Sequence, residues 1–399
     1  MLYNNKKVDI HQKKILVISN TASMIVQFNM NNLRILKDLG YKVEVACNFL
    51  EGNTCTTIII NELKKTLNHM NILFHQIDFE RDISCFTKHI KAYKKLKKII
   101  ESGSFDIIHC HTPIGGVLTR LAGKKFRKQG TIIIYTVHGF HFFKGAPLKN
   151  WLLFYPVEWL CSWWTDILIT INREDYQIAK KHLHAKKVRY IPGVGIDTEK
   201  FKNNSIDRKK KREELCVKPD DIMILSVGEL ITRKNHEIVI KALNQINNSN
   251  VQYFIAGKGA LEMKLKELVH KLHLDYQVHF LGFRTDISEL CQAADLFVFP
   301  SHQEGLPVAL MEAIACKTPV VCSRIRGNTD LVKEKEDLFD PNNRDELVVC
   351  LNDLLRNGTQ ISLKEKMQCS VEANYKNLKK YNLSNVMDEM KNLFNKLEN

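Results

Sequence analysis

Short apolar runs alternate with longer amphipathic stretches along most of this chain, and that alternation limits the folds open to it. In the first half the runs are nearly continuous in β-branched residues, as expected for strands covered on both faces. They occupy residues 15–19, 43–47, 72–77, 105–111, 132–138 and 167–171. The stretches between them predict helices, among them residues 28–39, 86–101, 148–164 and 173–181. Strands that alternate with helices predict a parallel, doubly wound sheet.

The alternation stops and then restarts, which indicates two domains. From Tyr190 to about Asp220, Pro, Gly and a basic run interrupt it, and we expect the chain to cross between domains there. Apolar runs then recur at residues 222–227, 251–256, 278–281, 296–300 and 320–323, with a helical region at about 344–397. We therefore expect an α/β protein with two Rossmann-like domains, 1–195 and 196–375, and a cleft between them. A helix at 376–399 would pack back toward the first domain.

The composition indicates a globular protein that stays inside the cell. Hydrophobic residues make up 44% and charged residues 26% of the 399 residues, which is an ordinary globular mix. No apolar run reaches the ~18–20 residues needed to cross a bilayer, and the first residues do not resemble a secretory signal. The eleven cysteines are scattered from Cys47 to Cys369 without a CxxC pair, so we expect reduced thiols and no zinc site.

The net charge concerns partners rather than fold. The chain carries 59 Lys and Arg against 44 Asp and Glu, a formal charge of +15. Such an excess favours anionic lipid, nucleic acid or phosphorylated substrates.

The segment DLFVFPSHQEGLPVALMEAIACKTPVVCS carries the most chemistry. A buried strand at 296–299 leads into a loop with Glu304, and Pro307 suits the first turn of the following helix. That helix is apolar on every side except at Glu312, which predicts a buried helix with one buried carboxylate. Without partners, burying even a neutral polar group costs about 2–7 kcal/mol. Sugar hydroxyls are suitable partners, and the alternative is pairing with a basic residue or contact with solvent. Free N–H groups near Gly305–Val308 form an anion site.

Glu304 and Glu312 are separated by seven residues, and EGLPVALMEA resembles the E-x7-E motif of retaining glycosyltransferases of family 4, which share the GT-B fold. The resemblance covers nearly the whole chain and is closest to bacterial enzymes that assemble capsular and exopolysaccharide repeat units. It implies a metal-independent enzyme without a cofactor, which binds the nucleotide-sugar mainly in its C-terminal domain and the acceptor in its N-terminal one. Glu304 then faces the transferred sugar as a catalytic residue, Gly305 and Leu306 help to bind the donor, and Glu312 binds the ribose hydroxyls.

Three other segments of the second half fit the same resemblance. In SVGELITRKNHEIVIKAL, Gly228 lies at the nucleotide and Lys234 is the catalytic lysine that grips the diphosphate. Arg233 is taken as its basic partner, because Glu229 stands where the family often has arginine. Fixed cations stabilise a departing diphosphate as it gains charge. The alternative to diphosphate binding is that residues 232–235 form a solvated turn before a helix. Gly257 is half of a dinucleotide fingerprint and would border the nucleotide, and Phe283 would lie against the base.

Histidines at the ends of strands are the polar residues of interest in the first half. His138 directly precedes Gly139 at the end of a predicted strand, where α/β sheets bind ligands. The resemblance gives it a catalytic role against the donor sugar and phosphate. For His111 an ordinary structural role is the stronger alternative to acceptor binding. We expect Asn20, in a loop without glycines after the first strand, to shape the acceptor site. A histidine-only metal cluster is disfavoured, since no carboxylate lies nearby.

Two segments favour contact with an anionic membrane. FTKHIKAYKKLKKIIE (86–101) is basic with an apolar stripe, although such a stripe more often faces the core. NWLLFYPVEWLCSWW (150–164) concentrates aromatic residues, which are typical of an interface belt or of a buried helix pair. With the charge of +15, both suggest peripheral binding at the inner face of the cell membrane, where a lipid-linked acceptor would lie.

These observations predict a hexosyltransferase of cell-surface polysaccharide synthesis. It would move a sugar from a nucleotide-diphosphate donor, by family expectation a UDP-sugar, to a saccharide or undecaprenyl-linked saccharide acceptor with retention of configuration. A GT-B nucleotide-sugar epimerase is the alternative. A nucleic-acid-binding protein rests on charge alone and has no recognition motif, and we expect no nucleic-acid partner. A nicotinamide-dependent oxidoreductase fails on the incomplete glycine fingerprint.

Overall fold

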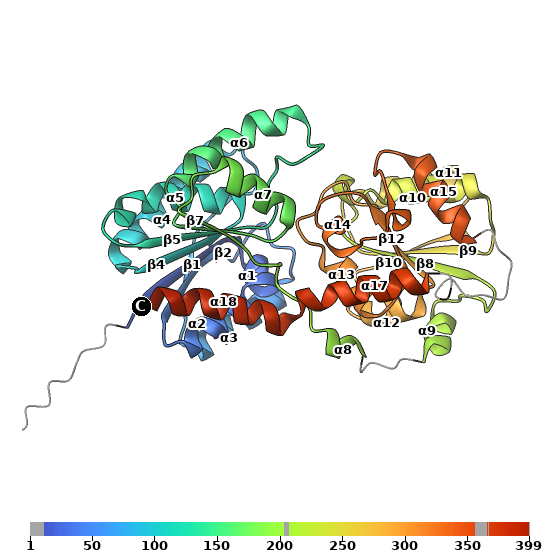
Figure 1. The fold of residues 1–399 in the computed structure, drawn as a ribbon, viewed down its shortest axis with the longest axis horizontal. Helices are drawn as coiled ribbons and strands as arrows, with labels where there is room; N and C mark the ends of the chain where they lie inside the picture. Colours follow the sequence, from blue (N-terminus) through green and yellow to red (C-terminus); the bar gives the residue numbers. More distant parts are fainter. Residues whose placement is uncertain (1–11, 203–206, 356–364, 366, 399) are drawn as a thin grey trace, which may run out of the picture. The chain divides into compact units, whose positions relative to one another are not determined.

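The computed structural model describes residues 12–202, 207–355, 365 and 367–398, and the chain divides into two compact units (Figure 1). Unit 1 comprises Met1–Val194 together with Val386–Asn399, and unit 2 comprises Gly195–Asn385. Each unit is built on its own sheet.

Unit 1 alternates strands and helices almost throughout. Its strands are β1 (Lys14–Thr21), β2 (Lys42–Asn48), β3 (Leu73–Gln76), β4 (Ile107–His111), β5 (Ile132–Val137), β6 (Ile167–Thr170) and β7 (Lys187–Tyr190). Its helices are α1 (Ala22–Phe28), α2 (Met30–Asp38), α3 (Thr57–His69), α4 (Phe86–Gly103), α5 (Pro113–Arg127), α6 (Leu148–Ser162) and α7 (Arg173–His182). Most of α18 (Leu383–Glu398) also belongs to this unit.

The seven strands of unit 1 form one parallel sheet in the order β3-β2-β1-β4-β5-β6-β7. The strand order reverses between β1 and β4, and ligands of such sheets bind beyond the carboxyl ends of the strands at that point. One face packs on α1, α2, α3 and α18, and the other packs on α4 to α7. The runs that form β1, β4, β5 and β6 are thus buried on both faces, as predicted, whereas the run at 72–77 forms the edge strand β3, where Leu73 is exposed.

Unit 2 repeats the plan. Its strands are β8 (Ile222–Val227), β9 (Val251–Ala256), β10 (Val278–Gly282), β11 (Leu296–Phe299), β12 (Val320–Ser323) and β13 (Leu338–Phe339). Its helices are α8 (Thr198–Lys202), α9 (Arg208–Glu214), α10 (His236–Ile246), α11 (Glu262–Lys271), α12 (Ile287–Ala293), α13 (Val308–Ala315), α14 (Asn328–Leu331), α15 (Arg344–Leu355) and α17 (Gln368–Leu378). Short 3-10 turns occupy Thr232–Lys234, Lys335–Asp337 and Lys379–Tyr381.

The sheet of unit 2 is also parallel, in the order β10-β9-β8-β11-β12-β13. Its reversal lies between β8 and β11, so the loops that follow these two strands meet at one edge. One face packs on α10, α11, α15 and α17 through a continuous apolar core. The prediction of two doubly wound parallel sheets is confirmed.

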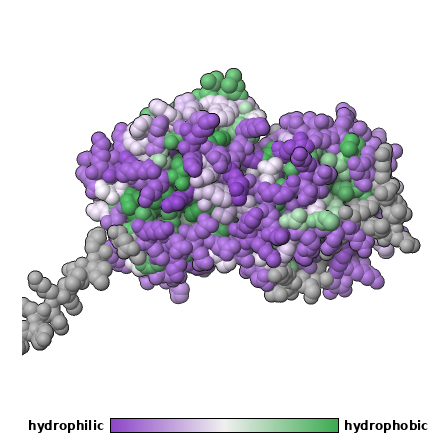
Figure 2. Space-filling model, viewed as in Figure 1, coloured by the Kyte–Doolittle hydropathy of each residue, from purple (hydrophilic) through white to green (hydrophobic). Residues whose placement is uncertain are grey.

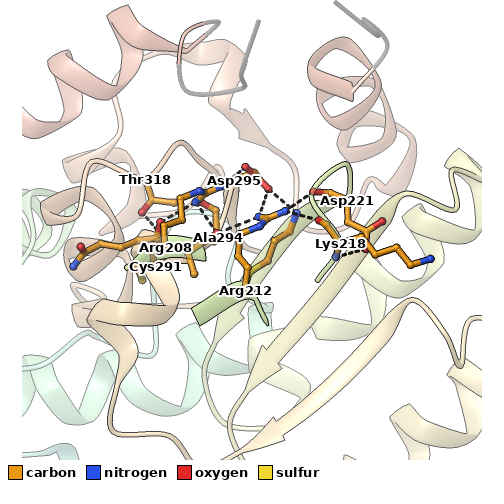
Figure 3. A network of polar contacts seen from close by, with 11 residues as sticks. Arg208, Arg212, Lys218, Asp221, Cys291, Ala294, Asp295 and Thr318 are labelled. Carbon is orange, nitrogen blue, oxygen red and sulfur yellow. Dashed lines mark hydrogen bonds and ion pairs between the residues drawn. The ribbon is translucent and has the colours of Figure 1, made fainter. Parts of the chain in front are cut away.

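Within the stretch that interrupts the sequence pattern, the basic run forms helix α9 (Figure 3). Arg208 donates to the carbonyls of Gln292, Ala293 and Ala294 at the end of α12 and pairs with Asp295. Arg212 also pairs with Asp295, at 2.9 Å. These arginines satisfy helix-end carbonyls that would otherwise lack partners. Part of the positive charge of the chain therefore has a structural role within unit 2.

The segment after β1 is helical, contrary to the prediction. The sequence predicts a loop from Asn20 to Ile25, but β1 continues to Thr21 and α1 begins at Ala22. Ser23 holds this helix to the segment after β2, since its hydroxyl accepts from the backbone N–H groups of Thr54 and Cys55 at 2.8 and 3.0 Å. Such side-chain contacts over some thirty positions are not visible in the local pattern.

Candidate functional site

Most of the donor-side residues lie where the strand order of unit 2 reverses. Gly228 directly follows β8, and the turn Thr232–Lys234 comes after it. Glu304 lies in the loop between β11 and α13. The reversal brings these loops together although about 70 residues separate them in sequence.

Glu304 is the centre of this arrangement. Its carboxylate is 9% exposed and accepts hydrogen bonds from Lys234 Nζ at 2.7 Å and Arg233 Nη1 at 3.2 Å. Arg233 also donates to the carbonyl of Gln303 at 2.9 Å, which fixes its guanidinium over the loop. Two cations meet one carboxylate, so the group carries one surplus positive charge. A site with that surplus attracts an anion.

Gly228 and Phe299 hold the side chain of Lys234 in place. Its stem lies against Gly228, where an added Cβ would come within 3.2 Å of Lys234 Cδ, and its Nζ lies 4.9 Å from the centre of the Phe299 ring. Gly257 packs even more closely, because a Cβ there would lie 1.8 Å from the carbonyl oxygen of Gly228. Gly257 thus allows the ends of β8 and β9 to approach each other, which is the tight strand-to-helix turn that its GxG spacing predicts.

The loop before α13 brings backbone N–H groups to the start of that helix. The helix begins at Val308, with Pro307 in the N-cap position rather than in the first turn, and no side chain caps it. Helix N–H groups without a cap favour an anion. Gly305 packs on Gly327, where an added Cβ would lie 2.4 Å from the Gly305 oxygen, and Leu306 is buried beside it.

Arg326 is a residue of this site that the sequence pattern did not single out. It is buried at 4% exposure, and its Nε donates to the carbonyl of Glu304 at 3.1 Å. A buried arginine that donates to this carbonyl holds the Glu304 loop in place. The only available signal in the sequence was an arginine beside Gly327, which is too common a pair to predict a site.

Glu312 is half-buried on α13, one turn beyond the helix start. Burial raises the pKa of its carboxyl from the ordinary 4.5 to about 7, and Lys200 of α8 opposes this shift only weakly. Within the described parts of the chain, its side chain has no hydrogen bond or ion pair. The expectation of a fully buried helix is thus wrong for one face, since Val308, Ala309 and Glu312 are all partly open to solvent.

Phe283 follows β10 and is 69% exposed. Gly257 N–H donates to the carbonyl of Gly282 at 2.8 Å, so the loop that carries Phe283 adjoins the Gly257 turn. An exposed aromatic ring beside a strand end is available to stack on a planar ligand.

Unit 1 contains a cavity of about 350 Å³ at the carboxyl ends of β4 to β7. Its walls come from these strand ends, from α1 and α2, and from α18, so that it lies entirely within unit 1. Apolar residues such as Ile169 and Met390 form part of the lining, while Asn31, Arg34 and His138 provide polar groups. This volume and mixed lining suit a small polar ligand.

His111 and His138 meet at this cavity. His111 Nδ1 lies 3.2 Å from His138 Nε2, and the His138 ring lies 5.3 Å from that of Phe28. Burial lowers the pKa of His138 to about 4 and that of His111 well below its ordinary value. The neighbouring His109 is fully buried and bonds Thr136 at 2.8 Å, so its role is structural. Both cavity histidines are therefore neutral near pH 7, each with one nitrogen that accepts.

The side chain of Asn20 makes hydrogen bonds within unit 1. Its Oδ1 accepts from Thr112 Oγ1 and from Gly115 N–H, both at 2.7 Å. Thr112 directly follows His111 and has φ +67° and ψ 151°, a backbone conformation that is costly for any residue except glycine. Asn20 thus holds a strained turn that sets the position of His111.

No group of three or more His, Cys, Asp or Glu side chains in the described residues is placed to hold a metal ion.

Comparisons with known proteins agree across both units. Residues 14–172 match the family described as glycosyl transferase 4-like, and residues 207–374 match glycosyl transferases group 1. The protein named "Putative glycosyltransferase EpsD" of Bacillus subtilis (strain 168) is 36% identical over 331 residues, 82% of this chain and 83% of that protein. The UDP-Gal:alpha-D-GlcNAc-diphosphoundecaprenol alpha-1,3-galactosyltransferase of Escherichia coli is 32% identical over 267 residues, 65% and 68% of the two chains.

Solved structures share the fold. Anabaena HepE in complex with UDP and glucose superposes with a TM-score of 0.73 at 19% identity, over 96% of this chain and 100% of HepE. WaaG, a glycosyltransferase involved in lipopolysaccharide biosynthesis, gives a TM-score of 0.69 at 16% identity, over 95% and 99% of the two chains. The architecture is the GT-B fold of these enzymes. The two family matches and the similarity to EpsD show that this chain belongs to the group 1 glycosyltransferases, with a glycosyltransferase 4-like N-terminal unit.

Proposed function

We propose that this protein transfers a hexosyl group from a nucleotide-diphosphate sugar to a saccharide acceptor with retention of configuration, in the synthesis of a cell-surface polysaccharide. The observation that carries the proposal is the convergence of Lys234 and Arg233 on Glu304, with one surplus positive charge, at the strand reversal of unit 2. A nucleoside diphosphate is an anion of the kind that this group and the uncapped start of α13 would attract.

In this proposal, Lys234 and Arg233 stabilise the leaving diphosphate, aided by the N–H groups at Gly305 and Leu306. Charge that develops on a leaving group is best stabilised by donors already held in position, and Lys234 is held by Gly228 and Phe299. Glu304 orients the transferred sugar. We further propose that attack takes place on the front face of the donor, with the leaving diphosphate accepting the proton of the incoming hydroxyl.

Glu312 is proposed to bind the ribose hydroxyls. Its carboxyl lacks protein partners among the described residues, and its pKa is raised to about 7, so two hydroxyl donors would relieve an unfavourable burial. Phe283 is proposed to stack on the base, and Gly257 to border the nucleotide. Uracil is the proposed base, because the Escherichia coli relative is named for UDP-Gal and HepE binds UDP.

Unit 1 is proposed to bind the acceptor in the cavity that His111 lines, with Asn20 as the residue that positions the turn after His111. His138 is proposed as the catalytic residue of this unit that meets the transferred sugar. The name of the Escherichia coli relative includes a diphosphoundecaprenol-linked sugar, which supports a lipid-linked acceptor here. We propose that the protein acts without a metal ion, on the cytoplasmic side of the cell membrane. No helix in the described residues is long and apolar enough to cross a membrane.

The test is thermal stabilisation by nucleotides. Wild type, Glu312→Ala and Glu267→Ala are compared with UDP, GDP, ADP and their sugars; Glu267 is an exposed carboxylate on α11 and serves as the matched control. We expect UDP to raise the melting temperature of wild type and of Glu267→Ala, and to raise that of Glu312→Ala far less. If no nucleoside diphosphate stabilises wild type, the donor site is misassigned.

A further inference from the structure

Helix α6 exposes an apolar face to solvent. Single exposed leucines are ordinary, but a contiguous group of large apolar side chains on one helix marks an interaction surface. The exposed fractions are 74% for Leu148, 71% for Leu152, 58% for Leu153, 41% for Val157, 40% for Trp159, 49% for Leu160 and 52% for Trp163. Figure 2 shows a green projection over α6. We call these seven residues the α6 face.

The inner side of the same helix fixes its orientation. Glu158 is buried and pairs with Arg120 Nη2 at 2.8 Å, and it accepts from Tyr135 Oη at 3.1 Å. Arg120 is fully buried and lies 4.0 Å from the centre of the Tyr135 ring. Turning the helix over would break a buried ion pair, which is strongly unfavourable. The α6 face therefore remains outside in the folded unit.

Lysines lie at both ends of the α6 face. From Lys144 to Thr165 the sole acidic residue is Glu158, which is buried. Lys144 and Lys149 are exposed at the start of the helix, and Lys124 lies over the Trp164 ring at 5.1 Å. The far end carries the aromatic pair Trp159 and Trp163, and Trp163 stacks on His184 at 4.1 Å. Apolar side chains, tryptophans and lysines together match the chemistry of an anionic membrane interface.

We propose that the α6 face inserts into the interfacial layer of an anionic lipid bilayer and holds unit 1 on the membrane. Two copies of this chain joined through the same face would bring like charges together, which opposes a symmetric dimer. In a bilayer the lysines can extend toward lipid phosphates while the leucines enter the acyl region. The proposal deepens the proposed function, since it explains how a lipid-linked acceptor is reached, and its test requires neither donor nor acceptor.

Helix α4, the other segment for which membrane contact is predicted, differs from α6 in the exposure of its apolar residues. Along α4 the apolar stripe of Ala92, Leu96 and Ile100 is buried in the core of unit 1, and its lysines point to solvent. Of its apolar side chains, Phe86 and Ile90 at the start of the helix are highly exposed. This makes α4 an internal control, because it is basic yet lacks a continuous exposed apolar face.

Vesicle binding tests the proposal in the full-length protein. All four tryptophans of the chain lie between positions 151 and 164, so intrinsic fluorescence reports on α6 and its end alone. We expect wild type to sediment with phosphatidylcholine vesicles that contain phosphatidylglycerol, and its emission to shift to shorter wavelength. Pure phosphatidylcholine vesicles should bind much less, and high salt should weaken binding.

Paired variants identify the surface. Leu148→Gln/Leu152→Gln changes two exposed residues and should lower the vesicle partition coefficient by at least about tenfold. Phe86→Gln/Ile90→Gln on α4 should bind as wild type does, and circular dichroism would check that both remain folded. Equal binding by the α6 variant, or lost binding by the α4 variant, would overturn the proposal. The proposal would also be overturned if wild type formed a dimer that does not bind vesicles, and if the Leu148→Gln/Leu152→Gln variant were a monomer.

Discussion

Replacing Glu312 with glutamine should stabilise unit 2 at neutral and alkaline pH. Burial raises the pKa of this carboxyl from 4.5 to about 7, so the folded chain holds a proton that the unfolded chain releases above about pH 4.5. The free energy of unfolding of wild type therefore falls as pH rises between these two values. At about 1.4 kcal/mol per pKa unit, the full effect is about 3 kcal/mol above pH 7. Glutamine has the same shape as the protonated form and carries no charge.

The assay compares wild type and Glu312→Gln by urea unfolding at about pH 4.5 and about pH 8, the two sides of the folded-state pKa. Circular dichroism follows both units, whereas tryptophan fluorescence follows unit 1 alone, so their difference isolates unit 2. Other shifted groups, such as Asp337, contribute equally to both proteins and cancel. We expect equal stability at the lower pH and a more stable variant at the higher one.

The same substitution should weaken nucleotide binding. The pH dependence of the affinity for UDP should differ between wild type and the variant. Ribose hydroxyls prefer the ionised carboxylate, so wild type must release a proton to bind UDP below pH 7. Its affinity for UDP, relative to that of Glu312→Gln, should fall by about tenfold from pH 8 to pH 6. Calorimetry in two buffers of different ionisation enthalpy would detect the released proton. A Glu312→Gln variant that is less stable than wild type at pH 8 would refute the reasoning.

Three further outcomes follow from the contacts. Gly257→Ala should destabilise unit 2 by about 3 kcal/mol or more, seen as a lower melting temperature, because its Cβ would lie 1.8 Å from the Gly228 oxygen; a variant that melts as wild type does would contradict the close approach. Arg120→Met should cost about 3–5 kcal/mol by leaving Glu158 buried without its cation, and adding Glu158→Gln should recover part of that loss. The His138 ring should titrate near pH 4 by NMR, so stability should fall as pH drops from about 6.5 toward 4; a midpoint near 6.5 would show that the ring is not buried.

Local patterns predicted the strands well where burial is continuous. The run Ile222–Val227 matches β8 at both ends, because β-branched and apolar residues on both faces leave no other interpretation. The short β7 (Lys187–Tyr190) and β13 (Leu338–Phe339) were missed, since an edge strand is half polar and two residues carry no period. The packing of the Arg208 helix could not be predicted, because its partners lie some 85 positions away.

The sequence could name candidate members of the site but not their contacts. The spacing of Glu304 and Glu312 and the position of Lys234 followed from resemblance to a known motif. That Lys234 pairs with Glu304 depends on the strand order β8-β11, which no local pattern encodes. The role of Asn20 in holding Thr112 was missed for the same reason, as its partner belongs to a strand end some 90 positions away.

The most direct test of the account is product analysis with UDP-sugars and an undecaprenyl-diphosphate-linked saccharide. NMR of the product gives the anomeric configuration of the new bond, and mass spectrometry detects released UDP. We predict transfer with the configuration of the donor preserved. The turnover of Lys234→Ala should lie far below that of wild type, at temperatures where the variant is still folded. An isomerised nucleotide-sugar formed without acceptor, or transfer that Lys234→Ala supports at the wild-type rate, would contradict the account.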